Sequence, residues 1–150
     1  MLKFIVPLAL LLAAATPAQA QIEGATEADA ILQDFTFATG EKLPELKLHY
    51  TTLGTPQRDA KGNVTNAVMI LHGTGGTGKQ FFQPQFASEL FGPGQPLDTS
   101  KYYVILPDNI GHGGSSKPSD GLRMKFPKYD YADMVAAQRR LLTEKLGVQK

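Results

Sequence analysis

Residues 67–78 read AVMILHGTGGTG, an apolar run followed directly by a loop that contains four glycines. The continuous apolar run over 67–71 is typical of a strand that is buried on both faces of a parallel sheet. Residues 102–106 (YYVIL) repeat this pattern, and Pro84 between the two runs favours the first turn of a short helix. A buried strand, a helix and a second buried strand predict a right-handed βαβ unit and the α/β class.

N-terminal to this unit, residues 34–51 predict an antiparallel hairpin with one face in solvent. Phe35 and Phe37 alternate with small residues, Gly40-Glu41 suits the turn, and residues 46–51 (LKLHYT) alternate apolar and polar. Residues 21–33 are small and polar, and they predict a flexible lead-in. We therefore expect the folded domain to cover residues 34–150.

C-terminal to the second buried strand, residues 108–128 form a long loop rich in Gly, Ser and Pro. A helix should follow it over 131–145, with Asp130 as the N-cap and Asp133 near the positive end of the helix dipole. Gly147 suits the residue after the helix. The expected buried face of this helix carries Met134, Val135, Gln138, Leu141 and Leu142.

The first twenty residues have the pattern of a cleavable signal peptide. Lys3 precedes an apolar run, 4–15, and Ala18-Gln19-Ala20 fits an A-x-A cleavage site. The run is shorter than the roughly twenty residues that cross a bilayer, although an uncleaved anchor is the alternative. We expect cleavage near Ala20 and a secreted or periplasmic protein with no membrane contact after cleavage.

Composition narrows the possible partners. The 150 residues are 42% hydrophobic and 19% charged with a net charge of +1, which does not favour nucleic acid or an anionic membrane as a partner. The absence of cysteine from the sequence excludes disulfides and thiolate nucleophiles. Three scattered histidines without matching carboxylates do not predict a metal site, and no cofactor is expected.

The glycine loop fits three motifs. Gly73, Gly78 and Lys79 satisfy the phosphate-binding G-x-x-x-x-G-K, but Gln80 replaces the Ser or Thr that would hold magnesium. The spacing also satisfies the dinucleotide fingerprint G-x-G-x-x-G. That motif requires an acidic residue about twenty positions on, at the end of the next strand. Asp98 has the spacing but precedes the strand, so both nucleotide interpretations are disfavoured.

The third interpretation is an oxyanion hole. Acyl transfer to a serine places negative charge on the carbonyl oxygen, and preorganised backbone N–H groups stabilise it. A glycine-rich loop after a strand can supply such donors. A plain glycine turn between strand and helix is the structural alternative. Asp108, His112 and Ser115 together suggest a triad, but the glycines between them would hold the set poorly, so we expect a structural loop.

Residues 71–73 (LHG) resemble the oxyanion segment of the α/β-hydrolase fold superfamily. Residues 108–115 (DNIGHGGS) match its D-x-x-G-x-G-x-S stretch. Three further segments resemble the homoserine O-acetyltransferase-like branch: 46–55 (LKLHYTTLGT), 89–96 (ELFGPGQP) and 107–123 (PDNIGHGGSSKPSDGLR). The resemblance implies a serine nucleophile in G-x-S-x-G with a later Asp and His. It also implies backbone oxyanion donors at Thr74 and Gly73, with Gly75 and Gly76 beside the substrate.

No G-x-S-x-G occurs in residues 1–150, and the resemblance places the nucleophile just beyond Lys150. The predicted fold is therefore the N-terminal part of an α/β-hydrolase fold: an antiparallel hairpin leading into a parallel βαβ sheet, truncated before the nucleophile elbow. We expect a fragment of a secreted hydrolase that acts on a small ester or other acyl substrate. The fragment should be inactive alone and prone to aggregate through an unpaired strand 67–71. An acyltransferase fragment and a non-catalytic binding module are the alternatives.

Overall fold

The computed structural model describes residues 24–149, and the predicted signal peptide, with its cleavage site at Ala20, lies outside them. Four strands form one sheet in the order β1-β2-β4-β3. Their bounds are β1 Thr26–Thr36, β2 Lys42–Leu53, β3 Ala67–Met69 and β4 Tyr103–Pro107. The helices are α1 Pro84–Leu90 and α2 Tyr131–Arg140, and α2 continues as a π-helical segment, Leu141–Leu146.

The sheet joins an antiparallel half to a parallel half, as the sequence predicts. β1 pairs antiparallel with β2, and β2 pairs antiparallel with β4. β3 pairs parallel with β4, in register Ala67↔Tyr103. A 3-10 helix, Gly78–Phe82, and α1 connect β3 to β4, which completes the predicted βαβ unit.

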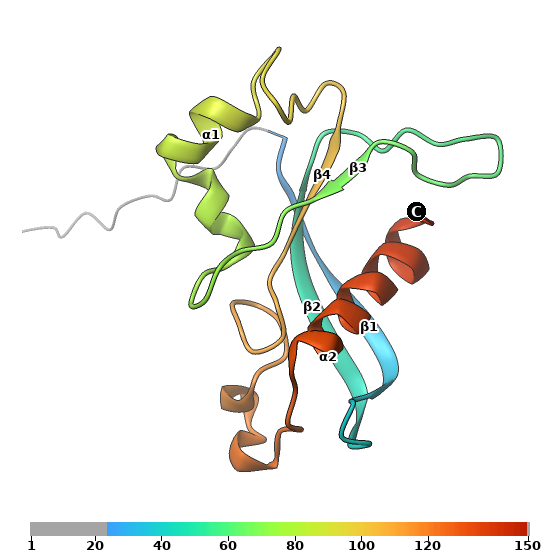
Figure 1. The fold of residues 1–150 in the computed structure, drawn as a ribbon, viewed down its shortest axis with the longest axis vertical. Coiled ribbons are helices and arrows are strands. Elements are labelled where there is room, and N and C mark those ends of the chain that lie inside the picture. Colours follow the sequence, from blue (N-terminus) through green and yellow to red (C-terminus); the bar gives the residue numbers. More distant parts are fainter. Residues whose placement is uncertain (1–23, 150) are drawn as a thin grey trace, which may run out of the picture.

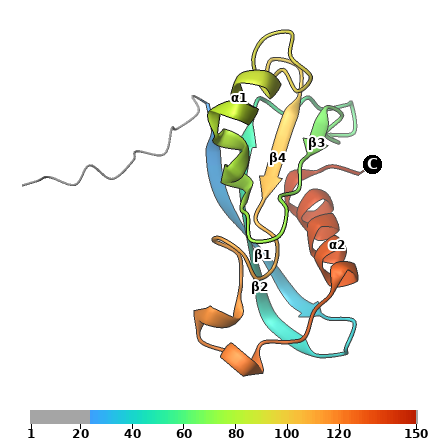
Figure 2. The same ribbon diagram turned by 60° about the vertical axis from the view of Figure 1, so that its left-hand side comes forward.

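Two hydrophobic cores lie on opposite faces of this sheet, because α1 and α2 cover opposite sides (Figures 1 and 2). Successive residues of β4 serve the two cores in turn. Tyr103 and Ile105 pack with α2, Phe35 and Phe37, whereas Val104 and Leu106 belong to the other core. The uninterrupted apolar sequence of β4 follows from this burial on both sides.

Residues 26–33 correct the predicted flexible lead-in. They form most of β1, which pairs with β2 from Thr26↔Thr52 onward. Ala30 and Leu32 are buried in the core beneath α2. Apolar Ile31, between the buried Ala30 and Leu32, interrupts the apolar-polar alternation that would indicate a strand from sequence.

β3 is shorter and less buried than the apolar run 67–71 predicts. It has three residues, all half-buried, and Leu71 beyond it is 48% exposed. The reason is its place at the edge of the sheet, where only β4 pairs with it. An edge position for this strand agrees with the expectation from sequence.

α2 begins as predicted. The Asp130 side chain accepts from the N–H groups of Ala132 and Asp133, and the Asp133 side chain accepts from the Asp130 N–H, which completes a capping box. Gly147 adopts φ 76° after the π-helical segment. The buried face differs from the prediction in one respect: Val135 is 61% exposed and Ala137 is fully buried instead. No helix within residues 24–149 is long and apolar enough to cross a membrane.

Candidate functional site

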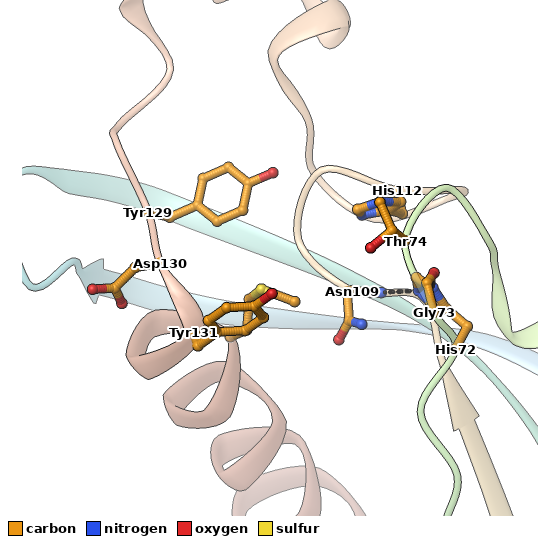
Figure 3. A pocket seen from close by; sticks show the side chains of 9 residues that line it. His72, Gly73, Thr74, Asn109, His112, Tyr129, Asp130 and Tyr131 are labelled. Carbon is orange, nitrogen blue, oxygen red and sulfur yellow. Dashed lines mark hydrogen bonds between the residues drawn. The ribbon is translucent and has the colours of Figure 1, made fainter.

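A cavity of about 420 Å³ opens where the glycine loop leaves β3. It lies between this loop, the segment after β4 and the N-terminal end of α2 (Figure 3). These are the carboxyl ends of two parallel strands, the usual position of a ligand site in an α/β sheet. The lining residues are His72, Gly73, Thr74, Asn109, His112, Tyr129, Asp130, Tyr131 and Met134.

Residues 73–76 form a tight turn whose first two residues line this cavity. The Gly76 N–H donates to the Gly73 carbonyl oxygen at 3.0 Å, and Gly75 adopts φ 76°. A positive φ at the third position indicates a type II turn, for which glycine is favoured. Within residues 24–149, no hydrogen-bond acceptor contacts the N–H of Gly73 or Thr74.

The four loop residues singled out from the sequence therefore separate into two pairs. Gly73 and Thr74, the predicted oxyanion donors, line the cavity. Gly75 and Gly76 complete the turn and are not among the lining residues. Their contact with substrate stays a prediction.

The P-loop geometry is absent, because the groups that would bind phosphate are used internally. The Gly78 N–H donates to the Asp108 carboxylate at 2.8 Å. Lys79 Nζ lies 2.7 Å from the Glu27 carboxylate on β1. The hydrogen bond from Lys79 is the main cause that lowers the pKa of Glu27. The Gly78 N–H and the Lys79 ammonium, the two groups that would contact phosphate in a P-loop, are therefore each paired with a carboxylate of the chain.

Asp108 organises the segment that follows β4. Its carboxylate accepts a second backbone N–H, from Gly114 at 2.8 Å, and the residue is buried. Gly113 adopts φ 49°, and a Cβ at this position would collide with the Asp108 carboxylate. Asp108 thus ties the glycine loop to the segment after β4, a role that the sequence did not predict.

Asp108, His112 and Ser115 do not form a triad. Ser115 is fully buried; its hydroxyl donates to the Asp108 carbonyl oxygen at 2.7 Å and accepts the His49 N–H at 2.9 Å. The His112 Nδ1 contacts the Ile110 carbonyl oxygen at 3.2 Å. These contacts agree with the structural role that the sequence predicts for this loop. Within residues 24–149, no cluster of three or more acidic or histidine side chains could hold a metal ion.

Most of the wall opposite the glycine loop was not predicted from the sequence. Tyr129, Tyr131 and Met134 contribute aromatic and apolar surface from the start of α2, and Asn109 contributes from the segment after β4. Figure 3 shows the two tyrosines across the cavity from Thr74 and Gly73. The only feature of the sequence that could have indicated this wall is the position of Tyr129 directly before Asp130, the N-cap of α2.

Comparison with known proteins gives a consistent result. Residues 66–150 match the family described as alpha/beta hydrolase fold. A probable acyltransferase of Methanothermobacter thermautotrophicus is 36% identical over 120 residues, which are 79% of this chain and 36% of the relative. A homoserine O-acetyltransferase of Solidesulfovibrio magneticus is 36% identical over 139 residues, covering 83% of this chain and 33% of the relative.

Among solved structures, an acetylester hydrolase from Corynebacterium glutamicum aligns with a TM-score of 0.67 and 29% identity. The alignment covers 81% of this chain and 34% of that protein. The chain thus spans about a third of the length of the relatives that it matches.

Proposed function

Because the chain belongs to the alpha/beta hydrolase fold family, we propose that it supplies the oxyanion-stabilising loop of a secreted serine hydrolase. The substrate is a small ester or another acyl compound. The predicted homoserine O-acetyltransferase-like branch is confirmed by relatives of that name. The observation that supports the proposal is that Gly73 and Thr74 line the cavity and that no acceptor within residues 24–149 contacts their backbone N–H groups.

In this proposal the attacking serine comes from sequence beyond Lys150, since residues 1–150 contain no G-x-S-x-G. The histidine implied beyond residue 150 takes the proton of the serine hydroxyl as the serine oxygen adds to the acyl carbonyl, and the carbonyl oxygen takes the negative charge. Amides that are already oriented toward that oxygen stabilise it without reorganisation. The cavity wall of Tyr129, Tyr131 and Met134 would contact the apolar part of a small substrate.

Proline at position 74 provides a sharp test, because it removes one backbone donor and fits the turn. Thr74 occupies the second position of the type II turn, where proline is common. In the protein expressed from its complete coding sequence, Thr74→Pro should lower kcat for p-nitrophenyl acetate about a hundred- to a thousandfold. Thr74→Ala changes the same side chain but keeps the N–H, so the ratio of the two variants isolates the amide. Equal activity of both variants would contradict the proposal.

Labelling with a fluorophosphonate tests the serine nucleophile itself. The complete protein should form a stoichiometric adduct that mass spectrometry places on a serine after residue 150. If an active protein gave no adduct, the serine mechanism would be wrong.

N-terminal sequencing of the exported protein tests the predicted signal peptide, and we expect a mature chain that starts at Gln21.

Acyl transfer to a substrate hydroxyl is the second candidate, because several of the matched relatives are named acyltransferases. Water and an alcohol attack the same acyl-enzyme, so both activities use the oxyanion loop. Export favours hydrolysis, since acetyl-CoA is a cytosolic donor. Turnover of an acetyl ester in the presence and absence of homoserine separates the two: O-acetylhomoserine forms only in acyl transfer.

A further inference from the structure

His72 has no role in the chemistry described so far, yet it is buried beside the candidate oxyanion donors. The Asn109 backbone N–H donates to His72 Nε2 at 3.0 Å, and His72 Nδ1 lies 2.8 Å from the Gly73 carbonyl oxygen. A backbone N–H can only donate, so Nε2 must be an unprotonated acceptor. A carbonyl oxygen can only accept, so Nδ1 must carry the proton. The two contacts therefore fix His72 as the neutral Nδ1–H tautomer.

The bond to Gly73 controls the direction of the neighbouring amide. The Gly73–Thr74 peptide bond is trans, so its C=O and N–H point in opposite directions. Two donors hold the C=O, His72 Nδ1 from one residue away and the Gly76 N–H at 3.0 Å. With its oxygen held in this way, the peptide directs the Thr74 N–H to the other side, where no acceptor among residues 24–149 contacts it.

The support for His72 extends to α2. Gln138 is buried on this helix and its side-chain amide donates to the Asn109 side-chain oxygen. Asn109 is itself buried, and its carbonyl oxygen accepts the His112 N–H at 3.0 Å. Asn109 is thus held on both sides while its N–H binds the imidazole (Figure 3).

We propose that His72 is the positioning residue that aims the Thr74 N–H into the cavity, and that Gln138 acts through Asn109 and His72. This inference rests on the proposed function, because it assigns the orientation of the oxyanion donor to the His72 side chain. The imidazole works as a neutral donor to Gly73, not as a catalytic base.

Two substitutions at position 72 separate positioning from general stability. Asparagine places its amide nitrogen near the position of Nδ1 and can still donate to Gly73. Glutamine reaches the position of Nε2 and can accept from Asn109, but its amide lies too far out to donate to Gly73. Each variant loses one of the two hydrogen bonds, so a purely structural role predicts similar activities and similar melting temperatures for both.

We expect His72→Gln to lower kcat about ten- to a hundredfold with KM changed less than about threefold. That is a smaller effect than full removal of an oxyanion donor. His72→Asn should stay within about threefold of the parent kcat. His49→Gln, at a half-buried histidine of β2 that contacts Asp29, controls for loss of a histidine. Equal losses in the two position-72 variants, or no loss in His72→Gln, would overturn the proposal.

The role of Gln138 is tested by a double-mutant cycle. Gln138→Met removes the amide and keeps the length of the side chain. It should lower kcat alone but add little to the loss in His72→Gln, since both changes act on the same peptide. Additive losses, or an unaffected kcat in Gln138→Met, would remove Gln138 from the proposal.

A measurement without substrate distinguishes failure of this inference from failure of the proposed function. Long-range ¹H–¹⁵N NMR of the complete protein, with ¹⁵N-labelled histidine, should show His72 with the proton on Nδ1 at pH 7. A proton on Nε2, or fast exchange between tautomers, would overturn the positioning role even if the enzyme were active. Absence of ester turnover with the expected tautomer would contradict the proposed function alone.

Discussion

Removal of the Asp108 carboxylate should destabilise the protein more than any other single charge change in the loops around the cavity. The carboxylate is buried and accepts the N–H of Gly78 and of Gly114, each at 2.8 Å. A hydrogen bond to a charged group contributes about 1.5–3 kcal/mol. Two such bonds amount to about 3–6 kcal/mol, which is a large part of the roughly 5–15 kcal/mol that stabilises a typical domain.

Asp108→Ala should therefore lower the free energy of unfolding by about 3–6 kcal/mol, because both amides lose their acceptor. Asp108→Asn keeps one acceptor oxygen but turns an NH₂ group toward the other N–H. We expect a loss of about 2–4 kcal/mol for this variant. The free energy of unfolding should therefore increase from Asp108→Ala to Asp108→Asn to the parent protein, in the order of the number of acceptor oxygens that remain.

Urea unfolding of the complete protein, followed by circular dichroism, measures these differences. Hydrogen exchange of the Gly78 and Gly114 amides gives a local readout, and both should exchange faster in the two variants. Glu89→Gln, on the exposed face of α1, is the matched control, with an expected change below about 0.5 kcal/mol. A loss below that size for Asp108→Asn would refute the assignment of Asp108 as the link between the two loops.

Three further predictions concern packing, pH and the sheet edge. Gly78→Ala should cost about 1–3 kcal/mol in urea unfolding, because a Cβ would lie 2.5 Å from the Leu106 carbonyl oxygen of β4; an unchanged midpoint would refute the close approach. The Ser100 hydroxyl, with the Gly94 and Ser100 N–H groups, lowers the pKa of Asp98 from 3.8 to about 2. The contribution of the Asp98 carboxylate to the free energy of unfolding should be present above about pH 4 and be lost as the pH falls toward 2. Asp98→Asn should remove this dependence in unfolding measured from pH 5 to 2. The purified 150-residue chain should hydrolyse no ester and sediment as aggregates, because β3 leaves one edge unpaired; a monomer with a sharp melt and turnover would contradict this.

The elements that could be predicted from the sequence are those fixed by local chemistry. The apolar run of β4 requires burial on both faces, and the structure has it between two cores. Asp130 is the N-cap of α2, as predicted, because its side chain binds N–H groups within one turn of the chain. The motifs at residues 71–73 and 108–115 indicated the family. They are recognisable in sequence because each turn after a strand requires glycine at particular positions of its own backbone.

The tertiary structure alone decided the features that depend on partners distant in the chain. β1 starts at Thr26 because β2 is long enough to pair with it, and nothing in residues 21–33 indicates the length of that partner. Lys79 pairs with Glu27 of β1, a partner that is distant in the chain. His72 holds the Gly73 peptide only because folding brings the Asn109 N–H, 37 positions away, to its ring. Hydrogen bonds of this kind depend on where the sheet places two loops, and that placement is set by the whole fold.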